Sequence, residues 1–170
     1  CLPLHIDAKV GDVFTQGNLK YTVLTENGAK GTVSVAAASK SISGELNIPE
    51  SVENGNVAYS VTVIVDFAFR DCVGLTQLEI PNSVMTIGQY AFCGCSGFTG
   101  KLIIPSNVTS IGKCSFERCS GFTGIELPSS ITNIEEGVFE DCSSLKGILT
   151  IPNSITSIGE FAFSGCQKLS

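Results

Sequence analysis

From about residue 44 onward, short apolar stretches alternate with turn residues in a unit that returns every 23 or 24 positions. Each unit opens with alternating apolar and polar side chains, as in Leu78-Glu79-Ile80, and a proline follows. This alternation predicts a short strand, which the proline ends because it donates no ladder hydrogen bond. A second extended piece, such as Val84 to Ile87, then reaches a glycine where we expect the chain to bend.

Two columns of equivalent residues keep the same phase through every unit. They belong to an A-F-x-x-C segment, whose spacing of small and aromatic residues predicts a short helical turn. So short a unit cannot bury its apolar face alone, whereas stacked copies can, because equivalent side chains then pack on one another. We assign to this structural core ladder Phe69, Phe92, Phe116, Phe139 and Phe163, with Cys72, Cys95, Cys119, Cys142 and Cys166.

The repeat therefore predicts a solenoid, a right-handed stack of short parallel β-strands joined by short helical turns. Residues 44–170 form an array of five repeats, the first with an insertion near residues 50–60 that carries an Asn54-Gly55 hairpin signal. Residues 1–43 lack the repeat and alternate in hydropathy, which predicts a leader and an antiparallel β-meander. We expect this N-terminal β cap to cover one end of the stack.

The position at which each unit is expected to bend, which we call the bend column, is not occupied by the same residue in every copy. Glycine stands at Gly88, Gly112 and Gly159, while Val65 and Glu135 replace it in the other two copies. We infer that the bend tolerates a side chain, so that glycine is helpful there without being required.

The unit I-P-N-S-V-x-T-I-G-x-Y-A-F-x-G-C-S-G-F, read from Ile80 to Phe98 and with small changes from Ile151 to Leu169, resembles the BspA-like leucine-rich repeat family. The likeness covers about residues 11–170. It implies a leucine-rich repeat stack and a surface or secreted protein of host-associated bacteria or mucosal parasites, often linked to adhesion. It brings no catalytic residues with it.

Composition narrows the function. Ten Lys and Arg against 16 Asp and Glu leave a net charge of -6, which lacks the basic footprint of a nucleic-acid binder. The single histidine, His5, offers little material for histidine-based catalysis, so we expect no enzyme and no cofactor. No stretch approaches the roughly 18 to 20 apolar residues of a membrane span.

Eight cysteines allow several interpretations. The five in one column are expected to be buried and unpaired, because free cysteine is among the most buried residue types. Cys93-Gly94-Cys95 has no second pair or histidine nearby, so we expect no metal site. Cys93 takes a position that is mostly polar in other copies, which predicts exposure, and a disulfide from Cys93 to Cys114 stays open.

Any binding surface should use the outward strand positions, since solenoids present equivalent residues on one continuous face. Their mixed identity favours a protein partner, such as host matrix or another cell surface, over a repeated small ligand. We thus expect a non-enzymatic, adhesin-like module; the alternative is a structural stalk or spacer of a longer surface protein without a partner of its own. The candidate binding residues are Asn47, Glu79, Ile103, Glu126 and Thr150.

Both chain ends carry expectations about location. We expect an extracellular or cell-surface protein. Cys1 is a candidate lipid-modified residue, Ile6-x-Ala8 loosely resembles a signal-peptide cleavage site, and a ragged end is the third reading. At Ser170, where a further strand should follow, we expect a longer array or an end covered by another copy.

Overall fold

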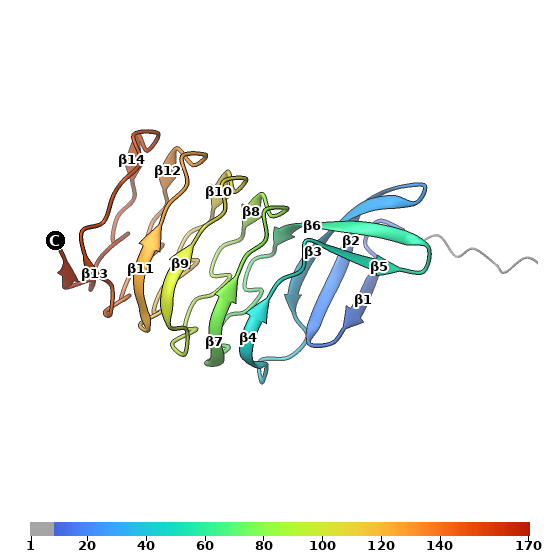
Figure 1. Ribbon diagram of the computed structural model, residues 1–170, viewed down its shortest axis with the longest axis horizontal. Coiled ribbons are helices and arrows are strands. Elements are labelled where there is room, and N and C mark those ends of the chain that lie inside the picture. The colour runs from blue at the N-terminus through green and yellow to red at the C-terminus, as the bar shows by residue number, and fades with distance from the viewer. Residues whose placement is uncertain (1–8) are drawn as a thin grey trace, which may run out of the picture.

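The computed structural model describes residues 9–170, so the expectations for Cys1, His5 and Ile6-x-Ala8 lie outside the described residues. The molecule is elongated, with a small antiparallel sheet at one end and a series of coils stacked along the long axis (Figure 1). We number the coils 1 to 5 by the phenylalanine that each contains, Phe69, Phe92, Phe116, Phe139 and Phe163.

The sheet at the N-terminal end is a meander of β1 (Val13–Gln16), β2 (Leu19–Asn27) and β3 (Lys30–Ala37), joined by tight turns. Alternate side chains point to one face, where Tyr21, Val23 and Val33 are almost completely buried. The pattern of apolar and polar residues therefore sets which face packs on the rest of the molecule.

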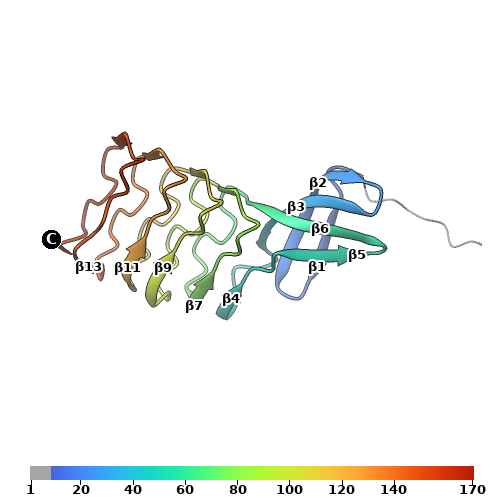
Figure 2. The ribbon, with the colours of Figure 1, turned by 45° about the horizontal axis from the view of Figure 1, so that its top comes forward.

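The insertion in the first repeat forms a hairpin of β5 (Ser51–Asn54) and β6 (Val57–Ile64). Strand β6 also pairs in parallel with β3, Val33 opposite Val61, so it joins the N-terminal sheet to the array (Figure 2). The Tyr59 hydroxyl donates to the Glu26 carboxylate across this junction. The insertion is thus the element that fixes the sheet to coil 1.

Two sets of short parallel strands run along opposite sides of the coils (Figure 1). One side, which we call the ladder face, continues the sheet from β6 through β8 (Thr86–Ile87) and β10 (Ser110–Ile111), and β12 (Asn133–Ile134) pairs with β14 (Ser157–Ile158). The other side, the strand face, has six strands: β4 (Ser43–Asn47), β7 (Gly74–Glu79), β9 (Gly100–Ile103), β11 (Phe122–Glu126), β13 (Lys146–Gly147) and β15 (Lys168–Leu169).

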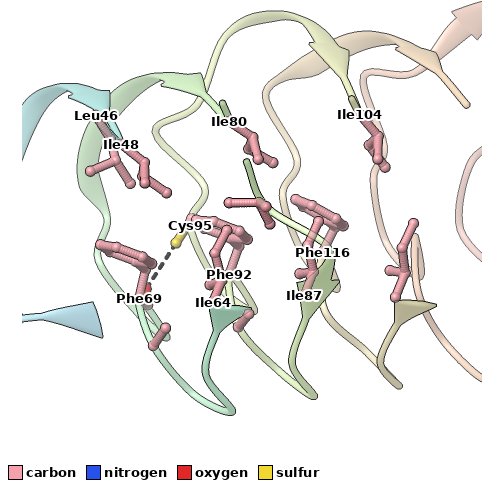
Figure 3. Close-up of a cluster of buried hydrophobic side chains, with 14 of the residues drawn as sticks. Leu46, Ile48, Ile64, Phe69, Ile80, Ile87, Phe92, Cys95, Ile104 and Phe116 are labelled. Atoms are coloured by element: carbon pink, nitrogen blue, oxygen red, sulfur yellow. Dashed lines mark hydrogen bonds between the residues drawn. The ribbon is translucent and has the colours of Figure 1, made fainter. Parts of the chain in front are cut away.

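Between the two faces, the column phenylalanines form a continuous stack (Figure 3). Ring centroids of successive coils lie 5.2, 5.2, 5.7 and 5.5 Å apart, with interplanar angles of 4° to 17°. Each column cysteine from coil 2 onward donates its thiol to the carbonyl of the phenylalanine one coil earlier, as Cys95 does to Phe69 at 3.0 Å. The same bond joins Cys119 to Phe92, Cys142 to Phe116 and Cys166 to Phe139 at 3.1 to 3.2 Å. The cysteine is therefore both a packing residue and a buried hydrogen-bond donor.

The prediction of short helical turns is wrong: no helix forms in residues 9–170. In the A-F-x-x-C segments of coils 1 to 4, alternate amides donate to the next coil, as Phe92 does to the Ser115 carbonyl at 2.8 Å, and so make no bond within their own turn. Positive φ occurs directly before the segment, as at Tyr90 (53°), and directly before its cysteine, as at Arg118 (59°) in coil 3. This left-handed backbone cannot continue an α-helix.

The glycine of the bend column is explained by close approach. The Gly112 amide donates to the Ile87 carbonyl at 2.8 Å, and a Cβ on Gly112 would lie 2.6 Å from the Gln89 nitrogen of the previous coil. Where Glu135 replaces the glycine, β10 and β12 do not pair, although strands pair at the other junctions of this face within residues 9–170. A side chain is tolerated at this position, but the ladder is interrupted there.

Candidate binding face

The structure places all five predicted binding residues on the strand face, and all five are exposed. Asn47 lies opposite Glu79 in the β4–β7 pair, and Ile103 lies opposite Glu126 in the β9–β11 pair. Thr150 follows β13 by three residues and is not part of a strand. The alternation in sequence therefore identified outward positions, four of which meet in two cross-strand pairs.

On the strand face, paired and unpaired neighbouring strands alternate, which the repeat pattern did not predict. Strands pair as β4–β7, β9–β11 and β13–β15, and no pairing joins β7 to β9 or β11 to β13 in the described chain. Coils 3 and 5 begin with an extra residue after a glycine of positive φ, Gly100 at 77° and Gly147 at 79°. Such an insertion displaces the strand from its predecessor, as a β-bulge does. The signal in the sequence was the alternation of 23- and 24-residue spacings.

Groove A, of about 410 Å³, lies between the unpaired strands β7 and β9. Its apolar lining comes from both strands and from the proline that follows β9. Amide and charged side chains surround that lining, and three of the five predicted residues line the groove. The residues that line groove A include Asn47, Gln77, Glu79, Asn82, Lys101 and Ile103.

Groove B, of about 390 Å³, lies between β11 and β13, two coils further along the stack. It contains the remaining two predicted residues, Glu126 and Thr150, with Lys146 and the aliphatic side chains of its walls. Ile148, the extra residue after Gly147, is 87% exposed at this groove. An isoleucine so exposed presents apolar surface that the fold itself does not use.

Charges on the face are arranged unequally. Lys101 lines both grooves and forms a salt bridge with Glu126 at 2.6 Å, with both side chains more than half exposed. Glu79 in groove A and Lys146 in groove B form no ion pair within residues 9–170. The face therefore carries a free negative charge at groove A and a free positive charge at groove B.

Within residues 9–170, the two cysteines outside the core ladder lie near one carboxylate, that of Glu117. Cys93 is 5% exposed, so the expectation that it is exposed is wrong: its thiol packs between coils, 3.8 Å from Glu117 Oε2. Burial, followed by the nearby Glu117 charge, raises the pKa of Cys93 to about 11. Burial also raises the pKa of Cys114, and both thiols are free, as are the five column cysteines.

No group of three or more His, Cys, Asp or Glu side chains in residues 9–170 is arranged to hold a metal ion. The same part of the chain has no helix with the length and apolar character needed to cross a membrane.

Several solved structures of bacterial proteins resemble this architecture. A leucine rich repeat protein of T. pallidum is 30% identical with a TM-score of 0.73, over 90% of this chain and 67% of that one. The pneumococcal vaccine antigen PcpA is 23% identical with a TM-score of 0.70, and a leucine rich cell surface protein of Faecalibacterium prausnitzii is 24% identical with a TM-score of 0.60. The matches cover 95% and 94% of this chain, which spans about half of each of those two proteins. No curated protein sequence matches the chain.

The repeat itself matches a sequence family. The model described as "BspA type Leucine rich repeat region (6 copies)" covers residues 40–170, which include the whole array. The match confirms the resemblance drawn from the repeated I-P-x-S motif. This chain belongs to the BspA-type leucine-rich repeat family.

Proposed function

We propose that the chain is a cell-surface or secreted module that binds a protein partner through its strand face. The observation that carries this proposal is the arrangement of five exposed outward residues beside two grooves of similar volume, on one side of a stacked and well-packed array. Aromatic stacking and inter-coil hydrogen bonds hold the backbone beneath the face, so its side chains are presented in fixed positions.

The family and its structural relatives support an extracellular location. One of the similar structures is named a cell surface protein and another a vaccine antigen, and surface exposure is what both descriptions have in common. An adhesive role, with host matrix or another cell as the partner, is the finer form of the proposal. Its mechanism is the display of outward side chains on a rigid ladder.

The proposed activity is binding without catalysis. The side chains that line grooves A and B in the described chain are aliphatic, amide, hydroxyl, lysine and glutamate groups, with no histidine or cysteine among them. Such a lining offers hydrogen bonds and apolar contact but no nucleophile held beside a base. It suits recognition of a partner surface.

The proposal is tested by surface plasmon resonance of the whole chain against immobilised extracellular matrix proteins. For any matrix protein that binds, the double variant Glu79→Lys with Glu126→Lys should weaken binding at least tenfold. The matched control is Glu160→Lys, which changes an exposed glutamate in the loop that follows β14 and should leave binding unchanged. Equal binding by both variants would contradict the strand face as the site, and no binding to any matrix protein would favour a structural stalk.

A further inference from the structure

We infer, on the basis of the proposed function, that the strand face takes an extended peptide segment in polyproline II conformation that lies along the stack. Apolar side chains three residues apart enter grooves A and B, a basic residue lies toward β7 and an acidic residue toward β13. Spacing, hydrogen-bond donors and charge together favour this occupant.

The spacing of the grooves comes from the alternating strand pairing. Groove A lies between coils 2 and 3 and groove B between coils 4 and 5, so the two are two coils apart. The column rings of coils 2 to 5 are 5.2, 5.7 and 5.5 Å apart in turn, which puts the groove centres roughly 11 Å apart. A polyproline II helix has three residues per turn and rises about 3.1 Å per residue, so side chains at i and i+3 point the same way about 9.3 Å apart. A β-strand repeats each face every two residues, after only about 6.7 Å.

The donors on the face indicate that main-chain carbonyls are recognised. Groove A contains the side-chain amides of Asn47, Gln77 and Asn82, and no hydrogen bond within residues 9–170 uses them. A polyproline II segment makes no internal hydrogen bonds, so its carbonyls need outside donors. An α-helix with apolar side chains at i and i+7 spans a similar distance, about 10.5 Å, but its carbonyls are already bonded. The amides therefore favour the polyproline II segment.

Charge complementarity supplies the remaining features of the occupant. Glu79 at groove A and Lys146 at groove B form no ion pair in the described chain, whereas Lys101 between the grooves is neutralised by Glu126. A segment with opposite charges at its two ends matches this arrangement. Exposed ion pairs contribute little to affinity, so we expect the charges to tune binding and the two apolar residues to dominate it.

Four labelled peptides test the inference by fluorescence anisotropy with the whole chain. The probe Arg-Pro-Leu-Pro-Pro-Leu-Pro-Glu should bind saturably. Adding one proline between the leucines should weaken binding at least tenfold, because the second leucine then misses its groove. Replacing the terminal glutamate by arginine should weaken binding several-fold, because an arginine then lies toward Lys146 whichever way the peptide runs. A helical peptide with leucines at i and i+7 should not compete.

Matched variants locate the site. Ile103→Ser, which removes an exposed isoleucine of groove A, should weaken binding of the probe at least tenfold. Ile158→Ser removes an equally exposed isoleucine on the ladder face and should have no effect. The inference is overturned by equal affinity for the two leucine spacings, by preference for the helical peptide, by equal effects of the two variants or by no binding of the probe. Matrix-protein binding that depends on Glu79 and Glu126 but not on these peptides would leave the proposed function intact.

Discussion

On the ladder face the strands pair at the junction between coils 2 and 3 and do not pair at the junction between coils 3 and 4, whereas on the strand face the reverse holds in the described residues. In the first, Gly112 lets β8 and β10 pair, Ser110 opposite Thr86 and Ile111 opposite Ile87. In the second, Glu135 stands in the glycine column and β10 and β12 are unpaired within the described residues. The ring centroids of Phe116 and Phe139 are 5.7 Å apart across the second junction, the widest step of the stack, against 5.2 Å across the first.

The array nevertheless continues through the second junction. The Phe116 amide donates to Val138 at 3.0 Å, the Cys142 thiol donates to Phe116 at 3.2 Å, and Lys113 contacts Glu136 at 3.0 Å. The core ladder and the β9–β11 pair of the strand face therefore hold coils 3 and 4 together, while ladder-face pairing is lost where Glu135 replaces glycine. Substitutions in the phenylalanine column and in the glycine column separate core packing from ladder-face pairing.

Phe116→Ala should have the largest effect, because this ring stacks on its neighbours across both junctions and is fully buried. Truncation of a buried phenylalanine costs about 3 to 5 kcal/mol, which urea unfolding followed by circular dichroism would measure. Phe163→Ala is the matched control, since this half-buried ring stacks on Phe139 alone. If Phe163→Ala lowered the unfolding free energy as much as Phe116→Ala, stacking across both junctions would not be the source of the effect at Phe116.

Alkaline pH should weaken both junctions through their buried thiols. Burial raises the pKa of Cys142 to about 12 and the pKa of Cys119 well above its usual value. Because these thiols ionise near pH 9 when unfolded, their stabilising contribution is complete below pH 9 and declines as pH rises toward the folded values. Each thiol should remove about 1.4 kcal/mol of unfolding free energy per pH unit in that window.

The measurement is urea unfolding between pH 8 and pH 10.5. In Cys142→Ala, the unfolding free energy should fall less steeply above pH 9, because one of the two ionising thiols is absent. The variant should also be less stable at pH 8, because the thiol hydrogen bond is lost. An unchanged slope in this variant would show that other groups cause the alkaline loss.

Gly112→Ala should reproduce the second junction at the first. The added Cβ would lie 2.6 Å from Gln89 and must push β10 away from β8, which we expect to cost about 1 to 3 kcal/mol, as for other overpacked sites. Gly124→Ala is the control, because its Cβ would meet only Lys101 Cγ at an ordinary 3.5 Å. Equal destabilisation by the two substitutions would mean that loss of glycine, and not close approach, is what matters.

The core was predictable from sequence because packing in a repeat acts on identical positions. The Phe column had to stack, since no other arrangement buries five equivalent rings from units this short. The thiol hydrogen bonds were not predictable, because a cysteine in an apolar column looks like any small buried residue. The A-F-x-x-C spacing suggested a helical turn, but amide bonds to the next coil, which no local pattern reveals, replaced the helix.

The candidate face was predictable only at the level of exposure. Alternation placed Glu79, Ile103 and Glu126 on the outside, and the structure has them there. Lys146 and Ile148 were missed, because they precede the recognised strand motif in coil 5 and reach the face through the bulge after Gly147. The grooves arise from unpaired neighbouring strands, a property of two coils together that a single unit does not contain.

Glu135→Gly should give the smallest change in stability and the clearest local one. Removing the side chain lets the residue 135 amide donate to the Ile111 carbonyl, as Gly112 does to Ile87, so its hydrogen exchange should slow at least tenfold. Global stability should change by less than about 1 kcal/mol, because glycine adds unfolded-state entropy and the Asn133 to Glu135 side-chain bond is lost. Glu135→Ala is the control by NMR-detected exchange: its Cβ should still block pairing, and equal protection in both variants would refute close approach as the cause of the broken ladder.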